Sequence, residues 1–563
     1  MKHKYRLIGI NDYSNPVTTI LINRQIIEPD TYINLNDSCI HSYNLLENMS
    51  EAVSLVGKHL NDNVHIIVDS DVDGYTSAAC VYKYFKDNFN ITCTYSLHSG
   101  KQHGLSSEVS IPDSVKLVII PDAGTNNTEQ CKVLVHKGID VLILDHHEQE
   151  IDNPYACIVN NQCCDYPNKD FCGVGIVYKF LQALDEEYWN EDADKYLDLV
   201  ALGNISDCMD MRSYETKRLV DKGLSKIRNK LFLKIIEEQS YSINDDININ
   251  NIQFYITPLL NALIRVGTQE EKELLFRAFI EDESETFSYK KRGESSPHNE
   301  DIYSRAVRFC KSAKAKQGRM VDKQLPDICE RIESKGKQNN SLIVMNVTDI
   351  IDPVLTGVVA IKVAEKYSRP TLLLRKNGEV FSGSARCPNH CPIYNFKDVI
   401  NSLNSFEFAQ GHQGAFGVQI KGSNVNNAIE QFNKYVSDNR ISLENCYLVD
   451  FEIEYTDFDI GLFQQIYECK QYYGNGIEEA YILIKNVPFL KDFIEVKGAN
   501  QNTWSIACDN GIEIIKFKCP EDDEMINYNK NNGMLNLIGK CSMNIYNGVK
   551  KPQIIIEDYE VIT

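Results

Sequence analysis

The sequence lacks any long hydrophobic run, and no apolar stretch approaches the roughly 20 residues of a membrane-spanning helix. The first residues, MKHKYRLIGINDYSN, contain no apolar segment of the signal-peptide type, so we expect no secretory signal. The 18 cysteines also lack the spacing of a secreted disulfide framework. Together these absences predict a cytoplasmic protein with reduced thiols and no membrane association.

Positive charge is also scarce. The chain has 58 Lys and Arg residues against 79 Asp and Glu residues, a formal net charge of -21. Such a surface disfavours broad, non-specific binding of duplex nucleic acid, although a local groove or a metal-loaded acidic cluster could still hold a single strand. With 563 residues, 43% of them hydrophobic, the chain is expected to be globular and to contain several domains.

Residues 64–79, VHIIVDSDVDGYTSAA, are the most informative stretch. The apolar start predicts a buried strand, after which Asp69, Asp71 and Asp73 alternate into a helix. Ligands of α/β sheets bind at the carboxyl ends of strands. Three carboxylates there repel one another unless a cation lies between them, which points to a divalent metal. A solvated acidic turn is the weaker alternative, because the strand is apolar and the pattern recurs downstream.

The recurrence spans one predicted domain. Apolar strands alternate with helical stretches, which is typical of an α/β fold with a parallel sheet; the strands are 64–68, 92–97, 117–120, 141–144 and 157–159. Asp122 follows the third strand, Asp145-His146-His147 ends the fourth, and Asp207 follows a helix. Carboxylates with one or two imidazoles suit manganese or magnesium better than a thiolate zinc site.

This arrangement resembles the DHH phosphoesterase superfamily and, within it, the RecJ family of single-strand-specific 5′→3′ exonucleases. Three further segments carry the likeness: FCGVGIVYK (171–179), LVALGNISD (199–207) and PLLNALIR (258–265). The resemblance implies two Mn²⁺ or Mg²⁺ ions, with Asp122 bridging them; the implied metal ligands are Asp69, Asp71, Asp73, Asp122, His146 and Asp207. It also implies that Asp145 orients His146 and that His147 joins the catalytic residues by facing the scissile phosphate.

The resemblance further implies substrate-binding residues. Arg265 would contact a phosphate. His98 stands where the family has an arginine, which would weaken the hold on the phosphate there, and Lys101 could compensate for that loss. In a second domain, the motifs SGSAR (382–386) and QGHQGAFG (410–417) are similar to those of the DHH-associated domain. They add Arg386 and His412 as substrate-binding candidates.

The predicted fold class is α/β with a C-terminal β-barrel. The expected order is an N-terminal arm (1–62), a parallel-sheet DHH catalytic domain (63–235), linking helices (236–340), a second α/β, DHH-associated domain (341–440) and a barrel similar to the OB-fold (447–563). Trp504, Phe517 and Tyr546 are candidate stacking platforms for bases, with core packing as the alternative.

Cations at three-residue steps mark the linking helices. Arg305, Arg308, Lys311 and Lys314 share one broad helix face, which favours a strand-binding role slightly over a solvated surface.

We interpret the chain as a metal-dependent exonuclease that hydrolyses single-stranded DNA 5′→3′ to nucleoside 5′-monophosphates by a two-metal mechanism. Its expected partners are single-stranded DNA and a single-strand-binding protein. Two alternatives stay open: a DHH phosphodiesterase for cyclic dinucleotides or short oligonucleotides, and a non-catalytic protein that binds single strands or recruits partners. The barrel counts against the first alternative, and the complete ligand set counts against the second.

Overall fold

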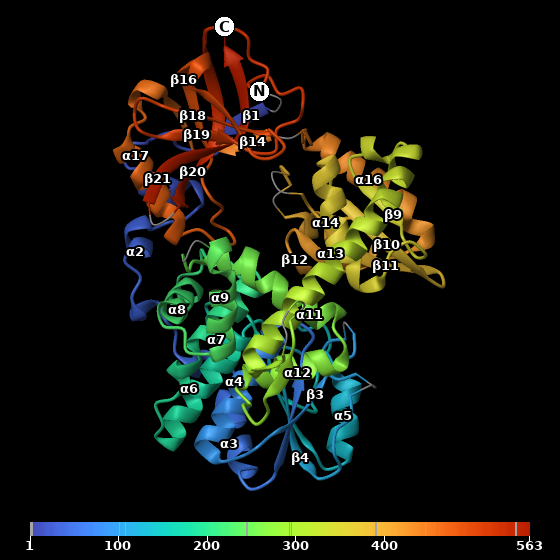
Figure 1. Ribbon diagram of the computed structural model, residues 1–563. Helices are drawn as coiled ribbons and strands as arrows, with labels where there is room; N and C mark the ends of the chain where they lie inside the picture. The colour runs from blue at the N-terminus through green and yellow to red at the C-terminus, as the bar shows by residue number, and fades with distance from the viewer. Residues whose placement is uncertain are drawn as a thin grey trace. The chain divides into compact units, whose positions relative to one another are not determined.

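The computed structural model describes residues 4–100, 102–106, 109–243, 246–291, 293, 296–388, 391–393, 395–444, 446–546 and 549–562 (Figure 1). Contacts divide the chain into two compact units. The first unit is Asp30–Gly318 with Tyr473–Ile477, and the second is Met1–Pro29, Arg319–Tyr472 and Glu478–Thr563.

A five-stranded, fully parallel sheet is the centre of the first unit. The spatial order is β3-β2-β4-β5-β6, and the bounds are β2 (Asn63–Val68), β3 (Thr94–Leu97), β4 (Val115–Pro121), β5 (Asp140–Asp145) and β6 (Cys157–Asn160). Each strand expected from the apolar runs is present. The strands read as continuous apolar segments because helices cover both faces of the sheet.

The crossover helices explain where a ligand can enter. Helix α4 (Val72–Phe89) follows β2 toward β3, whereas α5 (Thr128–His136) follows β4 toward β5, in the opposite direction along the sheet. Right-handed crossovers in opposite directions place the two helices on opposite faces, as Figure 1 shows. The connections that follow β2 and β4 therefore leave these neighbouring strands in opposite directions. Sheets of this kind bind ligands at such a point, at the carboxyl edge of the strands.

Helices complete the first unit. They are α3 (Met49–Lys58), α6 (Gly173–Tyr188), α7 (Leu197–Ser206), α8 (Tyr214–Ser225), α9 (Lys230–Ile243), α10 (Ile249–Asn251), α11 (Thr257–Val266) and α12 (Gln269–Phe279). A π-helical turn, η4 (Ile252–Ile256), leads directly into α11. The short α2 (Pro29–Ile33) and the long α13 (Ile302–Ser334) each run across a boundary between the two units.

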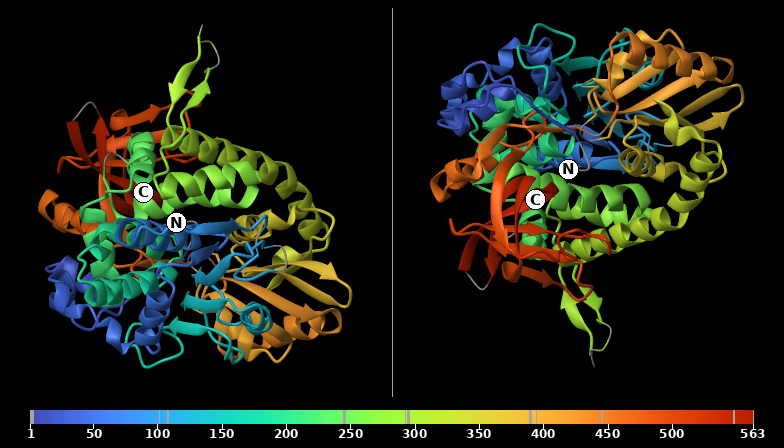
Figure 2. Two further views of the ribbon diagram at one scale, coloured as in Figure 1. Left: turned by 90° about the horizontal axis from the view of Figure 1, so that it is seen from below. Right: turned by 90° about the horizontal axis from the view of Figure 1, so that it is seen from above.

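A hairpin precedes α13 and explains the cations on that helix. Strands β7 (Phe287–Tyr289) and β8 (His298–Glu300) project as a narrow pair (Figure 2). The Arg305 guanidinium lies 4.4 Å from the centre of the Phe287 ring, and Arg308 lies 4.1 Å from that of Tyr289.

Two of these cations also have acidic partners. Arg308 pairs with Glu300 at 2.7 Å, and Lys311 pairs with Glu238 at 2.6 Å. These contacts favour a structural role for this face of α13 over the strand-binding role.

The second unit contains a mixed five-stranded sheet with the order β12-β13-β11-β10-β9. Only the β9–β10 pair is parallel within its described ladders. The bounds are β9 (Ile343–Asn346), β10 (Thr371–Asn377), β11 (Val380–Arg386), β12 (Phe406–His412) and β13 (Ala415–Lys421). The accompanying helices are α14 (Thr356–Tyr367), α15 (Phe396–Ser402) and α16 (Val425–Asp438).

Seven strands form the C-terminal sheet, in the order β15-β16-β20-β21-β19-β18-β17. They are β15 (Phe451–Glu454), β16 (Ile482–Leu490), β17 (Ile494–Lys497), β18 (Thr503–Ala507), β19 (Glu513–Lys516), β20 (Asn532–Tyr546) and β21 (Val549–Ile562). Trp504 is fully buried against Tyr559, so it belongs to the core, whereas Phe517 is exposed. The side chain of Tyr546 lies outside the described part.

The N-terminal segment packs in the second unit. Strand β1 (Lys4–Leu7) pairs in parallel with β14 (Cys446–Val449), and two helices, α1 (Pro16–Asn23) and α17 (Ile460–Glu468), contact each other. Arg24 forms a buried two-pronged ion pair with Asp450, with distances of 2.8 and 3.0 Å. Removing one partner of such a pair leaves a buried charge unpaired, which costs more than losing an exposed pair.

Two expectations about the whole chain can be checked here. The 18 cysteines all lie within the described residues and form no disulfide. We find no helix in the described part with the length and apolar character of a membrane span.

One buried histidine makes a testable prediction about stability. His65 lies on β2, with Nδ1 2.8 Å from Thr94 Oγ1 and Nε2 3.0 Å from Ser96 Oγ. Burial lowers the pKa of His65 from 6.5 to about 4. The unfolded chain therefore takes up a proton here as pH falls through that window while the folded chain does not, so the free energy of unfolding decreases, by up to about 3 kcal/mol.

We expect His65→Asn to flatten this pH dependence, because the asparagine side chain cannot be protonated. The measurement is the urea midpoint of both proteins from neutral pH down to pH 4. Parallel curves for the two proteins would contradict the prediction.

Candidate metal centre

The acidic residues predicted from the sequence follow the ends of the central strands. Asp69 comes directly after β2, Asp122 directly after β4, and Asp145 is the last residue of β5. Asp71 caps the N-terminus of α4, where its Oδ1 accepts the Gly74 N–H at 3.0 Å. Parallel strands put all of these positions at one edge of the sheet, although they are distant in sequence.

Three overlapping groups of side chains could hold metal ions, each with donor atoms within 4.8 Å of one another: Asp69, Asp71 and Asp122; Asp73, His146 and Asp207; and Asp122, His146 and His147. All six residues of the implied ligand set are therefore brought together. Asp122 and His146 each belong to two groups, so the groups adjoin.

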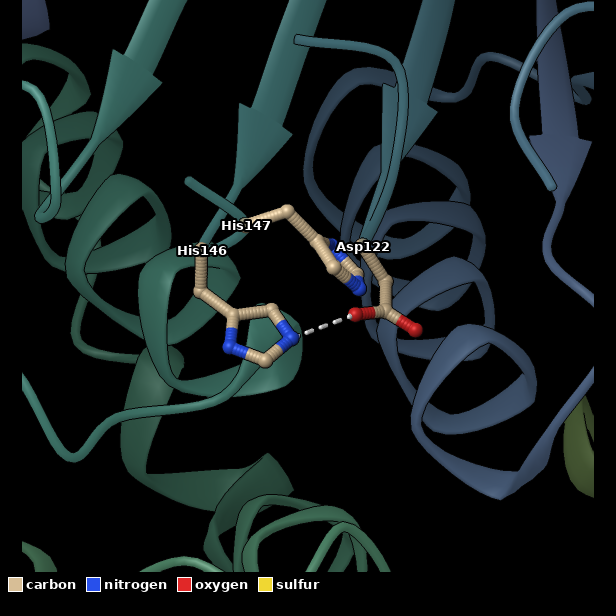
Figure 3. Close-up of side chains that lie close together, drawn as sticks. All are labelled: Asp122, His146 and His147. Carbon is tan, nitrogen blue, oxygen red and sulfur yellow. Dashed lines mark ion pairs between the residues drawn. The ribbon is translucent and has the colours of Figure 1, made fainter. Parts of the chain in front are cut away.

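Figure 3 shows Asp122, His146 and His147 converging from the ends of neighbouring strands. His146 Nε2 lies 3.3 Å from Asp122 Oδ1 and 3.5 Å from Asp207 Oδ2.

Asp122 adopts an unusual backbone conformation. Its φ is +69°, in the left-handed region that few residues other than glycine occupy, and its N–H donates to the Leu144 carbonyl at 2.8 Å. The side chain is buried, and apart from the 3.3 Å contact with His146 Nε2 its Oδ1 has no hydrogen-bond partner among the residues described. Such strain and such an oxygen are found where a ligand or ion compensates for them.

The N-terminus of α6 supports the cluster from one side. The backbone N–H groups of Gly173 and Val174 donate to the two oxygens of Asp73, at 2.7 and 3.0 Å. A Cβ at Gly173 would lie 2.5 Å from Asp122 Oδ1, so only glycine permits this close approach. Helix N-termini favour negative charge, which partly offsets the cost of burying these carboxylates.

Electrostatics make the cluster a candidate site for a cation. Burial, followed by the charges of Asp207 and Asp71, raises the pKa of Asp73 to about 7. Burial and neighbouring carboxylates also raise the pKa values of Asp71 and Asp122. A divalent ion would reverse this penalty, and a set of carboxylates with imidazole fits Mn²⁺ or Mg²⁺.

Asp145 positions both histidines that follow it. Its Oδ1 accepts the backbone N–H of His146 at 2.7 Å and lies 2.8 Å from the His147 Nδ1, while its Oδ2 accepts the Thr125 N–H at 3.0 Å. It therefore holds the ring of His147 and the main chain of His146. Although burial opposes ionisation, His147 and these hydrogen bonds hold the pKa of Asp145 well below its usual range.

The substrate-binding candidates have different outcomes. Arg265 on α11 is partly buried, and burial lowers its pKa while the nearby Asp71 carboxylate acts in the opposite direction. Its guanidinium makes no hydrogen bond or ion pair with a described residue. His98 is buried at the end of β3, where burial lowers its pKa.

The other three candidates lie outside the described residues or in the second unit. Lys101 lies outside the described residues. Arg386 ends β11 in the second unit and donates to the Ala385 carbonyl at 2.6 Å. The main chain of His412 lies in β12, opposite Ala415, and its side chain is outside the described part.

One residue of the site had no predicted role. His103 Nδ1 lies 2.6 Å from Asp69 Oδ2, and the Gly104 N–H donates to Asp69 Oδ1 at 2.9 Å. The Asp69 charge raises the pKa of His103. The available signal was positional: the loop after β3 must lie beside the end of β2, because the two strands are parallel neighbours.

Comparisons with known proteins agree with this arrangement. The DHH family, N-terminal domain, matches residues 63–204, and the RecJ OB domain matches residues 449–558. A Bacillus subtilis protein named as a prophage-derived single-strand DNA-specific exonuclease is 39% identical over 99% of this chain and 98% of its own.

More distant relatives match as well. The single-stranded-DNA-specific exonuclease RecJ of Bacillus subtilis is 24% identical over 97% of this chain and 68% of its own. The crystal structure of RecJ with Mn²⁺ from Thermus thermophilus matches with a TM-score of 0.70 and 17% identity, covering 99% of this chain and 79% of that one. A match at this level of identity shows a shared fold.

Gly173 provides a test of how the site is built. We expect Gly173→Ala to weaken Mn²⁺ binding by about tenfold or more, because the added methyl group must displace Asp122. Gly318→Ala is the matched control, since a Cβ on that helical glycine meets nothing within 4 Å. Calorimetric titration with Mn²⁺ measures both. Unchanged affinity in a folded Gly173→Ala protein would show that α6 does not press against the site.

Proposed function

The chain belongs to the RecJ-like members of the DHH family, and we propose from this that it is a metal-dependent exonuclease that hydrolyses single-stranded DNA 5′→3′ to nucleoside 5′-monophosphates. The observation that carries the proposal is the convergence of carboxylates and imidazoles at the carboxyl edge of the parallel sheet. The direction and the mononucleotide product come from the resemblance.

Two divalent ions would be held by side chains that already adjoin. Asp122 would serve both ions; Asp69 and Asp71 would complete one site, and Asp73, His146 and Asp207 the other. When bound, such ions lower the pKa of a water molecule and neutralise charge on phosphate oxygens.

The protein's own groups would position the strand beside that site. Arg265, close to Asp71, would neutralise charge that develops on the phosphate. His147 is half exposed and its Nδ1 is held by Asp145, so its other ring edge can contact the phosphate. His103 would hold Asp69 in place through their short contact.

The wider setting is part of the same proposal. We expect the protein to act in the cytoplasm, in keeping with its reduced thiols, and to meet its substrate together with a single-strand-binding protein.

The RecJ OB match over residues 449–558 favours a strand over a dinucleotide, which needs no such module. The intact donor set favours catalysis over binding alone.

The deciding experiment uses single-stranded oligonucleotides labelled at either end, with Mn²⁺. We expect the 5′ label to appear as a mononucleotide before the strand shortens further, the 3′ label to be released last, and blunt duplex to resist. Release of the 3′ label first would reverse the direction. Rapid cleavage of dinucleotides with an intact long strand would favour the phosphodiesterase alternative.

We expect Asp122→Ala to reduce cleavage about a thousandfold or more, because the loss of one shared carboxylate removes about 4 kcal/mol or more of transition-state stabilisation. Asp113→Ala is the control: this exposed aspartate lies before β4, at the opposite end of the strand from Asp122. Initial rates on labelled single strands measure the effect. Activity within tenfold of the wild type would exclude a shared ligand at this position.

A further inference from the structure

One face of α11 carries polar side-chain atoms that have no hydrogen-bond partner among the described residues. Thr257, Asn261 and Arg265 are spaced four residues apart, so their side chains lie on the same side of the helix. Thr257 Oγ1 and Asn261 Oδ1 are buried, and neither makes a hydrogen bond within the described residues. Arg265 likewise has no such bond there. We call this set the α11 polar face.

Its surroundings are the elements that build the metal centre. Helix α11 packs against α4 and α7. Asp71 caps the N-terminus of α4, and Asp73 lies in its first turn. Asp207 caps the C-terminus of α7.

The two ends of the polar face can be placed more closely. Four residues before Thr257, in η4, Gln253 Nε2 contacts Sγ of Cys208, the residue after Asp207, at 3.5 Å. At the far end Arg265 lies within electrostatic reach of Asp71. The α11 polar face therefore belongs to a helix that packs against both α4 and α7, and Asn261 is the middle residue of that face.

Burying polar atoms without partners costs stability, at about 1–3 kcal/mol for each group. Native proteins keep such groups mainly where a ligand or ordered water completes them. The π-helical turn η4 immediately precedes this face, and turns of that kind are frequent at functional sites.

The chemistry of the face indicates the kind of ligand. A guanidinium, a carboxamide and a hydroxyl can all donate hydrogen bonds, and rotation of the carboxamide presents either its oxygen or its NH₂ group. Donors in a row next to a cation site suit phosphate oxygens along a strand.

We propose that Asn261 is a substrate-binding residue whose carboxamide donates to a non-bridging oxygen of the phosphodiester held at the metal centre, with Thr257 and Arg265 contacting the same backbone. This inference rests on the proposed nuclease function and adds Asn261 and Thr257 to its substrate contacts.

Asn261→Leu tests the proposal, because leucine keeps the approximate volume and removes both hydrogen-bonding ends. Asn88→Leu is the matched control. Asn88 is also a partly buried helical asparagine of the first unit, but it bonds the Tyr84 carbonyl at 3.2 Å near the far end of α4.

The first readout is the dissociation constant for a short oligothymidylate, measured by fluorescence anisotropy with Ca²⁺ in place of the catalytic ions. We expect Asn261→Leu to weaken binding about tenfold, because it removes one hydrogen bond to a charged oxygen. Asn88→Leu should leave the dissociation constant unchanged.

The second readout uses a strand with a single methylphosphonate at its 5′-terminal linkage, which replaces one charged oxygen by a methyl group. Wild-type protein should bind this strand more weakly than the natural one, whereas Asn261→Leu should discriminate much less. A residue with only a structural role would lower both affinities equally, and that result would overturn the proposal.

Stability provides an independent check. Because leucine removes a buried carboxamide oxygen that has no hydrogen-bond partner among the described residues, the Tm of Asn261→Leu should equal or exceed that of the wild type. A clear fall in Tm would mean that the carboxamide is satisfied within the fold and would also overturn the proposal.

Asn261→Asp is a second variant: it keeps nearly the same shape but adds a negative charge, so it should weaken binding by more than about tenfold. Unchanged affinity for Asn261→Asp would overturn the proposal.

The outcomes separate this inference from the proposed function. Wild-type protein that neither binds nor cleaves the strand overturns both. Wild-type protein that binds and cleaves, while Asn261→Leu behaves like Asn88→Leu, overturns the inference alone.

Discussion

Repulsion among buried carboxylates is the constraint on which the first unit depends. Asp73 and Asp122 are buried and Asp71 is half-buried, all within a few ångströms of other acids, and their pKa values are raised as a result. A fold that kept these side chains only for packing would lose stability at each of them. Their convergence makes physical sense when a divalent cation supplies the missing positive charge.

The surrounding structure holds the acids in place against that repulsion. The N-terminus of α6 donates two backbone N–H groups to Asp73, and Gly173 lets the helix approach Asp122. Asp145 holds the His147 ring, and His103 holds Asp69. These contacts come from backbone N–H groups and imidazoles, and none of them is made by a lysine.

Much of this could be predicted because each part has a local signature. The strands were visible as apolar runs, and the acids and histidines after them were visible as interruptions in those runs. Parallel pairing then requires that residues after different strands share one edge. Asp69, Asp122 and His146 converge for this reason, whereas Asp207, more than 130 positions after Asp69, reaches the cluster from the C-terminus of α7.

Other features had no local signature. The regular spacing of Arg305, Arg308 and Lys311 suggested a strand-binding face. In the structure, however, the two arginines contact the hairpin and Lys311 pairs with Glu238. Trp504 could have been a platform or core, and burial decided for the core. His103 looked like any loop histidine until Asp69 was placed beside it.

The sequence by itself determined which side chains could bind ions, because residue type and position after a strand are local properties. Tertiary structure alone decided which polar groups are already paired and which remain available. Thr257 and Asn261 illustrate this: in the sequence they are ordinary helical residues, and only the packing of α11 against α4 and α7 buries them without partners among the described residues. Pairing depends on neighbours distant in the chain, and no local pattern records them.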